Sequence, residues 1–392
     1  MPGAGAQPHE LSGRHELLER ARVTLERVSL GRPAKSFVAV GLRGVGKTVL
    51  LNRVKQMADE RSYRTSFIEA HEQKSLPELL VPHLRRILLD FDRLGALSEQ
   101  AKRALRVLKS FMTAVKLKYG DAEISLDVDP EHGSADSGDL ETDLPELFGA
   151  LGRAAAARTT SVAIIVDEIQ YLSPRDMSAL IMAMHRIAQD NLPIVLIAAG
   201  LPQVVGLSGR SKSYVERLFD FPPVDALNHE DAVRALDLPV REEGGTFDPD
   251  ALDEIVQITR GYPYFLQEWG YHTWNTANSP RITMADVKAA NALAVRRLDE
   301  SFFRVRFDRL TPREKDYLRA MAQLGPGPHR SGDIAEELKI AVQAAGPLRG
   351  GLIGKGMIFS PAHGDTAFTV PLFDEFLRRI IPERHPPTRT RG

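Results

Sequence analysis

The chain has 392 residues, of which 43% are hydrophobic and 26% are charged, and its formal net charge at pH 7 is −1. This composition excludes a disordered chain, and the balanced charge means that contact with nucleic acid would need a local patch of lysine and arginine. Because the sequence contains no cysteine, it excludes disulfides, thiolate zinc sites and cysteine nucleophiles. A chain of this length is expected to form two or three domains.

The first ten residues are rich in glycine, proline and alanine, and they lack the basic start and apolar run of a secretion signal. No apolar stretch approaches the roughly 18–20 residues that cross a bilayer. We therefore expect a cytoplasmic protein with no membrane partner.

Strands and helices alternate in the first half of the chain. Apolar residues recur with helical spacing over 11–27, 48–58, 76–89, 144–157 and 176–189. Short apolar runs of strand length occupy 36–40, 65–70, 162–166 and 194–198. Alternation of this kind predicts an α/β fold in which a parallel sheet lies between two layers of helices, here over residues 1–225.

The alternation of strands and helices is interrupted from about residue 110 to residue 143. From 121 to 143, acidic residues accumulate among glycine and serine without a single lysine or arginine. We interpret this segment as an acidic insertion in the core domain. It is either a solvated loop, because like charges repel one another, or a regulatory or partner-binding loop.

Strand signals are absent over residues 226–308, which predict a separate α-helical domain, the lid. A third domain is predicted over 309–383, where Thr311, Pro312 and Glu314 combine an N-cap, a first-turn proline and a capping box. The remaining residues, 384–392, form a basic, proline-rich tail that we expect to be flexible.

The third domain has the element order of a winged helix. Helices are predicted over 312–324, 331–338 and 343–354, and strands over 357–359 and 367–370. Its candidate recognition helix holds Gln343, Arg349 and Lys355, but Gly346 and Pro347 interrupt it. Either DNA or a protein client is therefore an expected partner of this domain.

A glycine-rich loop follows the first strand and has the form G-x-x-x-x-G-K-T. Its residues are Gly41, Leu42, Arg43, Gly44, Val45, Gly46, Lys47 and Thr48. Glycines let the backbone N–H groups of such a loop converge on phosphate oxygens at the start of a helix, whose dipole favours anions. A chance glycine-rich turn is the alternative, but the strand before the loop and the helix after it favour a phosphate loop.

The side chains of this loop predict ATP and Mg²⁺ as ligands. Lys47 is expected to bridge the β- and γ-phosphates from a solvent-facing position, and the Thr48 hydroxyl to ligate Mg²⁺. Val49 is expected to complete the nucleotide-binding segment. We expect ATP and ADP to be the nucleotides bound.

Two carboxylates, Asp167 and Glu168, end the strand predicted over 162–166. At the carboxyl end of a parallel strand, a carboxylate points into the crevice where ligands bind. Asp167 is therefore expected to hold Mg²⁺, and Glu168 to orient and activate the attacking water. Alone, such a pair also fits the capped start of a helix, but downstream of a phosphate loop it favours an ATPase.

Together these features resemble AAA+ P-loop ATPases, in the branch that holds replication-initiator and STAND signalling ATPases. Residues 13–17 resemble an N-terminal box of that branch, which implies that Arg14 lies near the adenine. Residues 214–219 resemble the segment in which an arginine reaches a neighbouring subunit's ATP, which implies that role for Arg217, with Arg210 as the competing candidate. The lid sequence Gly261-Tyr262-Pro263 implies that Pro263 contacts the nucleotide.

The sequence also departs from this family pattern. Where many members have a polar sensor at the end of the fourth strand, this chain has Ala198, Ala199 and Gly200, and where many have a lid arginine it has Tyr264. Both departures favour a slow switch over a fast motor. For Arg217, an ordinary surface ion pair with Glu216 is the alternative.

Three functions are consistent with the sequence. The first is a slow ATPase that couples nucleotide state to the winged helix. The second is a DNA-associated ATPase that resembles replication initiators or transposition helpers and oligomerises on DNA. The third is a nucleotide-binding scaffold that hardly hydrolyses ATP. A homo-oligomer is expected under the second function and wherever Arg217 acts on a neighbour.

Overall fold

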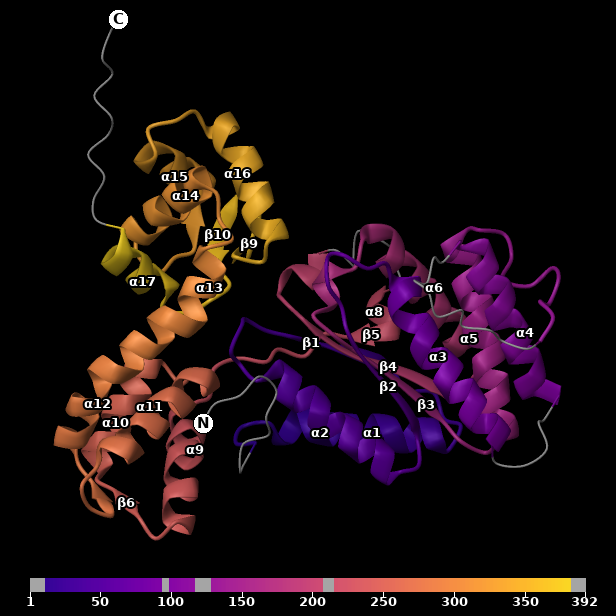
Figure 1. The fold of residues 1–392 in the computed structure, drawn as a ribbon, viewed down its shortest axis with the longest axis horizontal. Coiled ribbons are helices and arrows are strands. Elements are labelled where there is room, and N and C mark those ends of the chain that lie inside the picture. The colour runs from indigo at the N-terminus through magenta and orange to yellow at the C-terminus, as the bar shows by residue number, and fades with distance from the viewer. Residues whose placement is uncertain (1–10, 94–98, 117–127, 207–214, 382–392) are drawn as a thin grey trace, which may run out of the picture. The chain divides into compact units, whose positions relative to one another are not determined.

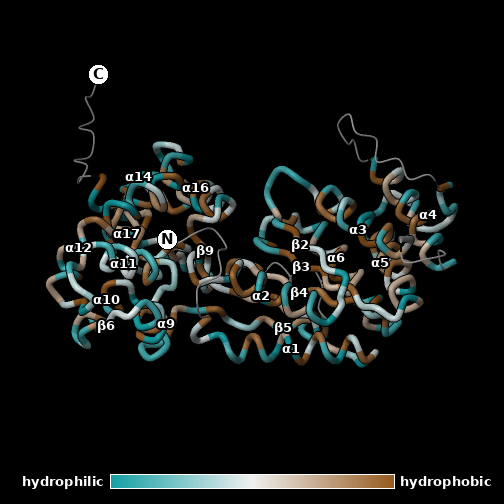
Figure 2. Tube along the Cα trace, turned by 60° about the horizontal axis from the view of Figure 1, so that its bottom comes forward, coloured by the Kyte–Doolittle hydropathy of each residue, from teal (hydrophilic) through white to brown (hydrophobic). Residues whose placement is uncertain are grey.

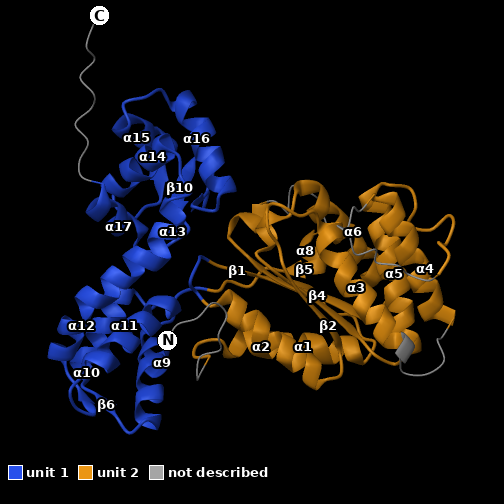
Figure 3. Ribbon diagram, viewed as in Figure 1, with its two compact units in different colours: residues 1–4, 42–45, 225–392 blue, residues 5–41, 46–224 orange. Residues whose placement is uncertain are grey.

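The computed structural model describes residues 11–93, 99–116, 128–206 and 215–381. These residues divide into two compact units (Figure 3). Of the described residues, 11–41 and those within 46–224 form the core unit, and 42–45 and 225–381 form the C-terminal unit. Within the described ranges, no helix is long and apolar enough to cross a membrane.

The core unit is built on a five-stranded sheet. Its strands are β1 (Ser36–Val40), β2 (Arg64–Glu69), β3 (Val162–Asp167), β4 (Ile194–Gly200) and β5 (Phe219–Asp220). They are all parallel and lie in the order β2-β3-β4-β1-β5. The carboxyl ends of β1 and β3 therefore meet at one edge of the sheet, with only β4 between them.

Helices cover both faces of this sheet (Figure 1). On one side lie α1 (His15–Ser29) and α2 (Lys47–Glu60), and on the other α3 (Leu76–Arg93), α4 (Glu99–Ala114), α5 (Leu140–Ala157) and α6 (Pro174–Gln189). Because side chains alternate along a strand, Ile164 and Val166 join the apolar cluster of α3 to α6, while Ile165 points to the opposite face. The predicted three-layer α/β core is confirmed.

Apolar residues are concentrated in the strands, whereas helices such as α1 alternate between apolar and polar positions along their length (Figure 2). The strands β3 and β4 are buried at every position. A parallel strand covered on both faces needs this continuous apolar run, which is why the sequence identified these strands without ambiguity.

The segment predicted as an acidic insertion, about 110–143, is partly helical in the structure. Helix α4 continues to Ala114 and α5 begins at Leu140, so both helices take up part of the segment 110–143. The loop residues 128–139 lie against these helices, where Arg103 and Arg106 of α4 form ion pairs with Glu131. The charge compensation that the segment itself lacks comes from a neighbouring helix. Residues 117–127 lie outside the described residues.

The first part of the C-terminal unit is helical. It contains α9 (His229–Glu242), α10 (Pro249–Thr259), α11 (Pro263–Thr276), α12 (Met284–Arg297), the π-helix η2 (Leu298–Phe303) and α13 (Arg304–Phe307). Two short strands, β6 (Thr246–Phe247) and β7 (Arg281–Ile282), pair in parallel. This helical part corresponds to the segment predicted as a lid.

The second part contains α14 (Pro312–Gln323), α15 (Ser331–Glu337), α16 (Val342–Gly354), α17 (Phe373–Ile380) and the strands β8 (His329–Arg330), β9 (Ile358–Phe359) and β10 (Asp365–Phe368). The strands form an antiparallel sheet in the order β8-β10-β9. The capping box at Thr311 is formed, with its amide donating to Glu314 at 2.7 Å. The interruption expected at Gly346 and Pro347 is wrong, because α16 runs through both residues.

One apolar cluster runs through both parts of the C-terminal unit, from Leu227 to Leu377. Aromatic rings of η2 join its halves, since Phe302 stacks on Tyr264 with centroids 4.6 Å apart and Phe303 stacks on Phe376 at 5.1 Å. The boundary predicted between 308 and 309 therefore crosses a continuous core, and the separation of lid and winged helix stays a prediction.

Candidate nucleotide-binding site

The loop between β1 and α2 needs two glycines for its backbone conformation. Gly44 and Gly46 have φ angles of +83° and +90°, in the left-handed region that favours glycine. Gly46 is also the N-cap of α2, so the loop ends at the amino terminus of a 14-residue helix. This geometry places at the loop the positive end of the helix dipole and the first-turn N–H groups, which have no acceptor within the helix itself.

Lys47 is the first residue of α2 and is buried, with 6% of its surface exposed. Its ammonium donates a hydrogen bond to the Gly41 carbonyl at 2.9 Å, across the base of the loop. The expectation that Lys47 faces solvent is therefore wrong. A buried ammonium needs acceptors, and its attachment to the loop carbonyl holds it where phosphate oxygens could replace that acceptor.

A hydrogen bond joins the phosphate loop to the end of β3. The Thr48 hydroxyl donates to Oδ2 of Asp167 at 2.5 Å, and the Glu168 amide donates to the other oxygen, Oδ1, at 2.9 Å. Asp167 is only 3% exposed. Burial raises the pKa of this carboxyl above its ordinary value, and the neighbouring Glu168 charge adds to the effect, while the Thr48 hydrogen bond and Lys47 oppose it.

Thr48 and Asp167 together offer the oxygen ligands that Mg²⁺ prefers. Among the described residues, no group of three or more histidine, aspartate or glutamate side chains could hold a metal by itself. This arrangement fits Mg²⁺, which is commonly held by one or two protein oxygens together with phosphate and water. The residues that the sequence assigned to the metal thus lie side by side.

Glu168 follows β3 in a left-handed backbone conformation, with φ of +52°. Its carboxylate accepts a hydrogen bond from the side-chain amide of Gln170. The sequence analysis did not identify Gln170. The only sequence signal was a polar residue two positions beyond the carboxylate pair, next to the apolar Ile169.

Arg217 lies at the amino ends of the strands, away from the loop of its own chain. It belongs to α8 (Val215–Leu218), directly before β5, and Phe219 pairs with Ser36 at the start of β1. At about 3.3 Å per residue, the five steps from Ser36 to Gly41 separate this position from the start of the phosphate loop by roughly 17 Å. Arg217 therefore cannot serve its own phosphate loop from this strand position.

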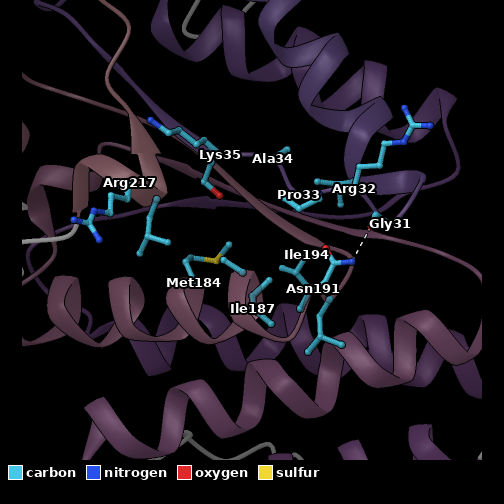
Figure 4. A pocket seen from close by; sticks show the side chains of 15 residues that line it. Gly31, Arg32, Pro33, Ala34, Lys35, Met184, Ile187, Asn191, Ile194 and Arg217 are labelled. Carbon is cyan, nitrogen blue, oxygen red and sulfur yellow. Dashed lines mark hydrogen bonds between the residues drawn. The ribbon is translucent and has the colours of Figure 1, made fainter.

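Arg217 is exposed and borders a cavity of about 220 Å³ (Figure 4). The apolar side chains of Met184, Ile187 and Ile194 lie in the middle of this view, and the Arg217 guanidinium points away from them. Among the described residues, Arg217 makes no ion pair, so the pairing with Glu216 is not found. Arg210 lies outside the described residues.

The two other predicted nucleotide contacts lie in different units. Arg14, in the core unit, is buried directly before α1 and donates to the Gly13 carbonyl at 3.2 Å. Pro263, in the C-terminal unit, is the first residue of α11. The roles of both residues at the nucleotide stay predictions.

The tip of the phosphate loop, residues 42–45, belongs to the C-terminal unit. Within that unit, the Tyr264 amide donates to the Gly44 carbonyl at 3.1 Å, and the Arg43 amide donates to the Thr369 carbonyl at 3.0 Å. Residues 264 and 369 lie in the helical part and in the segment after β10, respectively. The sequence contained no signal for these main-chain contacts.

Residues 10–197 match the family model described as the AAA ATPase domain. This segment, just under half of the chain, is similar to AAA ATPase domains. The Walker-type ATPase of Pyrococcus abyssi has a similar fold, with a TM-score of 0.59 and 19% identity over 95% of this chain and 97% of that chain. Similarity at 19% identity shows the fold alone. Because the match covers 95% of this chain, it includes the C-terminal unit.

Two further solved structures are similar at lower scores. Cdc6p from Pyrobaculum aerophilum has a TM-score of 0.49 and 14% identity, covering 96% of both chains. The Orc1 protein of Aeropyrum pernix, in complex with DNA, has a TM-score of 0.47 and 16% identity, covering 95% of this chain and 94% of that one. Residues 300–377 match a domain of unknown function, DUF8462. No curated protein matches the sequence.

Proposed function

We propose that the chain is an ATP-hydrolysing switch, in which the nucleotide bound to the AAA ATPase domain controls the C-terminal unit. The observation that carries the ATPase is the hydrogen bond between Thr48 and Asp167. It brings the phosphate loop, the predicted metal ligands and Glu168 to one edge of the sheet. That arrangement matches the chemistry that ATP·Mg requires.

Each side chain has a separate role in this proposal. The loop amides and Lys47 would bind phosphate oxygens, and Thr48 with Asp167 would hold Mg²⁺, which neutralises charge on the phosphates. Glu168 would accept a proton from the attacking water, as a carboxylate positioned beside the phosphate site can. Arg14 and Pro263 would complete the contacts to the base.

The coupling rests on the tip of the phosphate loop. The Arg43 amide is committed to Thr369, and Gly44 accepts from Tyr264. In a phosphate loop, the backbone amides are the groups that bind phosphate. Binding of nucleotide would therefore compete with the hydrogen bond from the Arg43 amide to Thr369. This competition supports a switch in which the nucleotide state changes the conformation of the C-terminal unit.

Hydrolysis in this proposal is slow within one chain. The strand β4 ends in Ala199 and Gly200 and so provides no polar side chain of its own beside the site. Arg217 lies at the opposite ends of the strands. We propose that Arg217 acts on the ATP of a neighbouring copy in an ATP-dependent oligomer. Arginines with this role are worth about 10³–10⁵ in rate.

The segment from α14 to β10 is proposed to be a winged helix that binds a protein client. Two cations near its candidate recognition helix are already engaged. Arg349 donates to Thr366 at 2.9 Å and to Ser360 at 2.8 Å, and Lys355 forms an ion pair with Glu314 at 2.7 Å. Contacts to DNA phosphates need lysine and arginine side chains that are not already paired. The surface that carries Arg349 and Lys355 is therefore poorly suited to DNA.

Size-exclusion chromatography with light scattering tests the switch. The chain should change its mass or elution volume between ADP and a non-hydrolysable ATP analogue, and duplex DNA should not alter either. Identical profiles in both nucleotides would contradict the switch. Salt-dependent retention on DNA would instead support a DNA-associated ATPase.

A further inference from the structure

Gln170 connects the end of β3 to the end of β4. It lies in the 3₁₀ turn η1 (Ile169–Tyr171), directly beyond the carboxylate pair, and is 7% exposed. Its side-chain nitrogen donates to Oε2 of Glu168, and its side-chain oxygen accepts from the Leu201 amide at 3.0 Å. Leu201 is the residue that follows β4. The two hydrogen bonds use both ends of one buried amide.

The orientation of this amide follows from its neighbours. A backbone N–H can only donate, so the oxygen of Gln170 must face Leu201. The NH₂ group is then turned toward Glu168, whose ionised carboxylate can only accept. Exchanging the oxygen and nitrogen would place donor against donor and acceptor against acceptor, so chemistry allows one arrangement only.

Gly200, the last residue of β4, provides the space for this link. A Cβ atom at Gly200 would lie 2.9 Å from the side-chain oxygen of Gln170, and 2.7 Å from a methyl group of Val204. Contacts this short are not found for real Cβ atoms, so any side chain at this position would displace Gln170 or its neighbours. The end of β4 thus lacks a polar side chain of its own and receives one from η1.

The backbone of Glu168 is held independently of its side chain. Its φ of +52° is unusual for a residue other than glycine, and its carbonyl accepts from the Tyr171 amide at 3.0 Å. With the main chain held in this way, the torsions of the glutamate side chain decide where the carboxylate lies. The hydrogen bond from Gln170 restricts them.

We propose that Gln170 is a positioning residue for ATP hydrolysis, which holds the Glu168 carboxylate by donating to it and takes the place of the polar sensor that the end of β4 lacks. This inference rests on the proposed ATPase function of the site. Gln170 acts through Glu168 and therefore affects the rate of hydrolysis. Nucleotide affinity, which depends on the phosphate loop and Lys47, is independent of it.

Gln170→Glu is the sharpest variant for the test. It keeps the size of the side chain and an oxygen acceptor for the Leu201 amide, but replaces the donor with an oxygen that cannot donate while ionised. Gln170→Leu removes both hydrogen bonds. Gln189→Leu, at the exposed end of α6, is the matched control. In steady-state assays, both Gln170 variants should lower kcat by about 10- to 100-fold, with KM and ADP affinity within about twofold of the parent.

A double-mutant cycle separates positioning from a general structural effect. If Gln170 acts through Glu168, adding Gln170→Glu to Glu168→Gln should not slow single-turnover hydrolysis further. A parental kcat in Gln170→Glu, a parallel change in KM, or an equal loss of rate in both backgrounds would overturn the inference. A parent that binds ATP without hydrolysing it would refute the proposed ATPase itself, and the role of Gln170 with it.

Discussion

Replacing Asp167 by asparagine should make the free protein more stable while removing its response to Mg²⁺. Asp167 is a buried carboxylate, and burial is the main cause of its raised pKa. Asparagine has nearly the same shape. Its oxygen can accept from the Glu168 amide as Oδ1 does now, and its NH₂ group can donate to the Thr48 hydroxyl.

Two opposing effects determine the change in the free energy of unfolding: two hydrogen bonds become weaker, and a buried charge is removed. Hydrogen bonds to a charged group contribute about 1.5–3 kcal/mol each and neutral ones about 1 kcal/mol, so the change weakens both contacts. Removing a buried charge relieves a penalty of several kcal/mol. The net gain in the free energy of unfolding should be on the order of 1 kcal/mol, which raises Tm by about 2–4 °C for a domain of this size.

Thermal unfolding with and without ADP and Mg²⁺ measures both parts of this prediction. Ligand at 100 times its Kd should stabilise the parent by about 2.7 kcal/mol. The Asp167→Asn variant should lose most of the part that depends on Mg²⁺. Asp59→Asn, which alters an exposed carboxylate paired with Lys55 on α2, is the control and should change neither. A ligand-free Tm several degrees below the parent, or an unchanged response to Mg²⁺, would refute this reasoning.

Three further predictions concern other residues. Lys47→Ala should abolish tight ATP binding in calorimetric titrations, with a folded chain by circular dichroism; parental affinity would refute its role. Specific ATPase activity should rise with protein concentration, and mixing Lys47→Ala with Arg217→Ala subunits should partly restore turnover, whereas activity independent of concentration would leave Arg217 without a role in trans. Burial raises the pKa of Glu268, and His272 opposes this only in part. The folded state therefore holds this proton more tightly, so the free energy of unfolding falls as pH rises through the raised pKa. Glu268→Gln should be more stable than the parent at pH 7–8, and the difference should close toward pH 4; a constant difference would contradict this assignment.

Much of the core was predictable because burial on both faces leaves a clear trace in sequence. The strand predicted over 36–40 is observed with the same bounds, and the one predicted over 194–198 extends only to Gly200. The spacing of the glycines before Lys47, with a predicted strand before the loop and a predicted helix after it, identified the phosphate loop equally clearly. Only the parallel order of the strands brings Asp167 next to Thr48.

The features that were missed depend on contacts distant in sequence. The hydrogen bond between Gln170 and Leu201 exists because β3 and β4 are neighbours and Glu168 adopts a left-handed conformation. Lys47 is buried because its ammonium folds back onto a main-chain carbonyl, which no side-chain pattern encodes. Pro347 was expected to break a helix, yet at this position the helix tolerates the loss of one backbone hydrogen bond.

The identity of the nucleotide retained by Glu168→Gln tests the central proposal most directly. The variant, the parent and Lys47→Ala would each be incubated with ATP and Mg²⁺, separated rapidly from free nucleotide, denatured and analysed by chromatography. We predict ATP in Glu168→Gln, ADP in the parent and no nucleotide in Lys47→Ala. ADP in Glu168→Gln at the parental level would show that another group activates the water, and nucleotide retained equally by all three proteins would contradict the site itself.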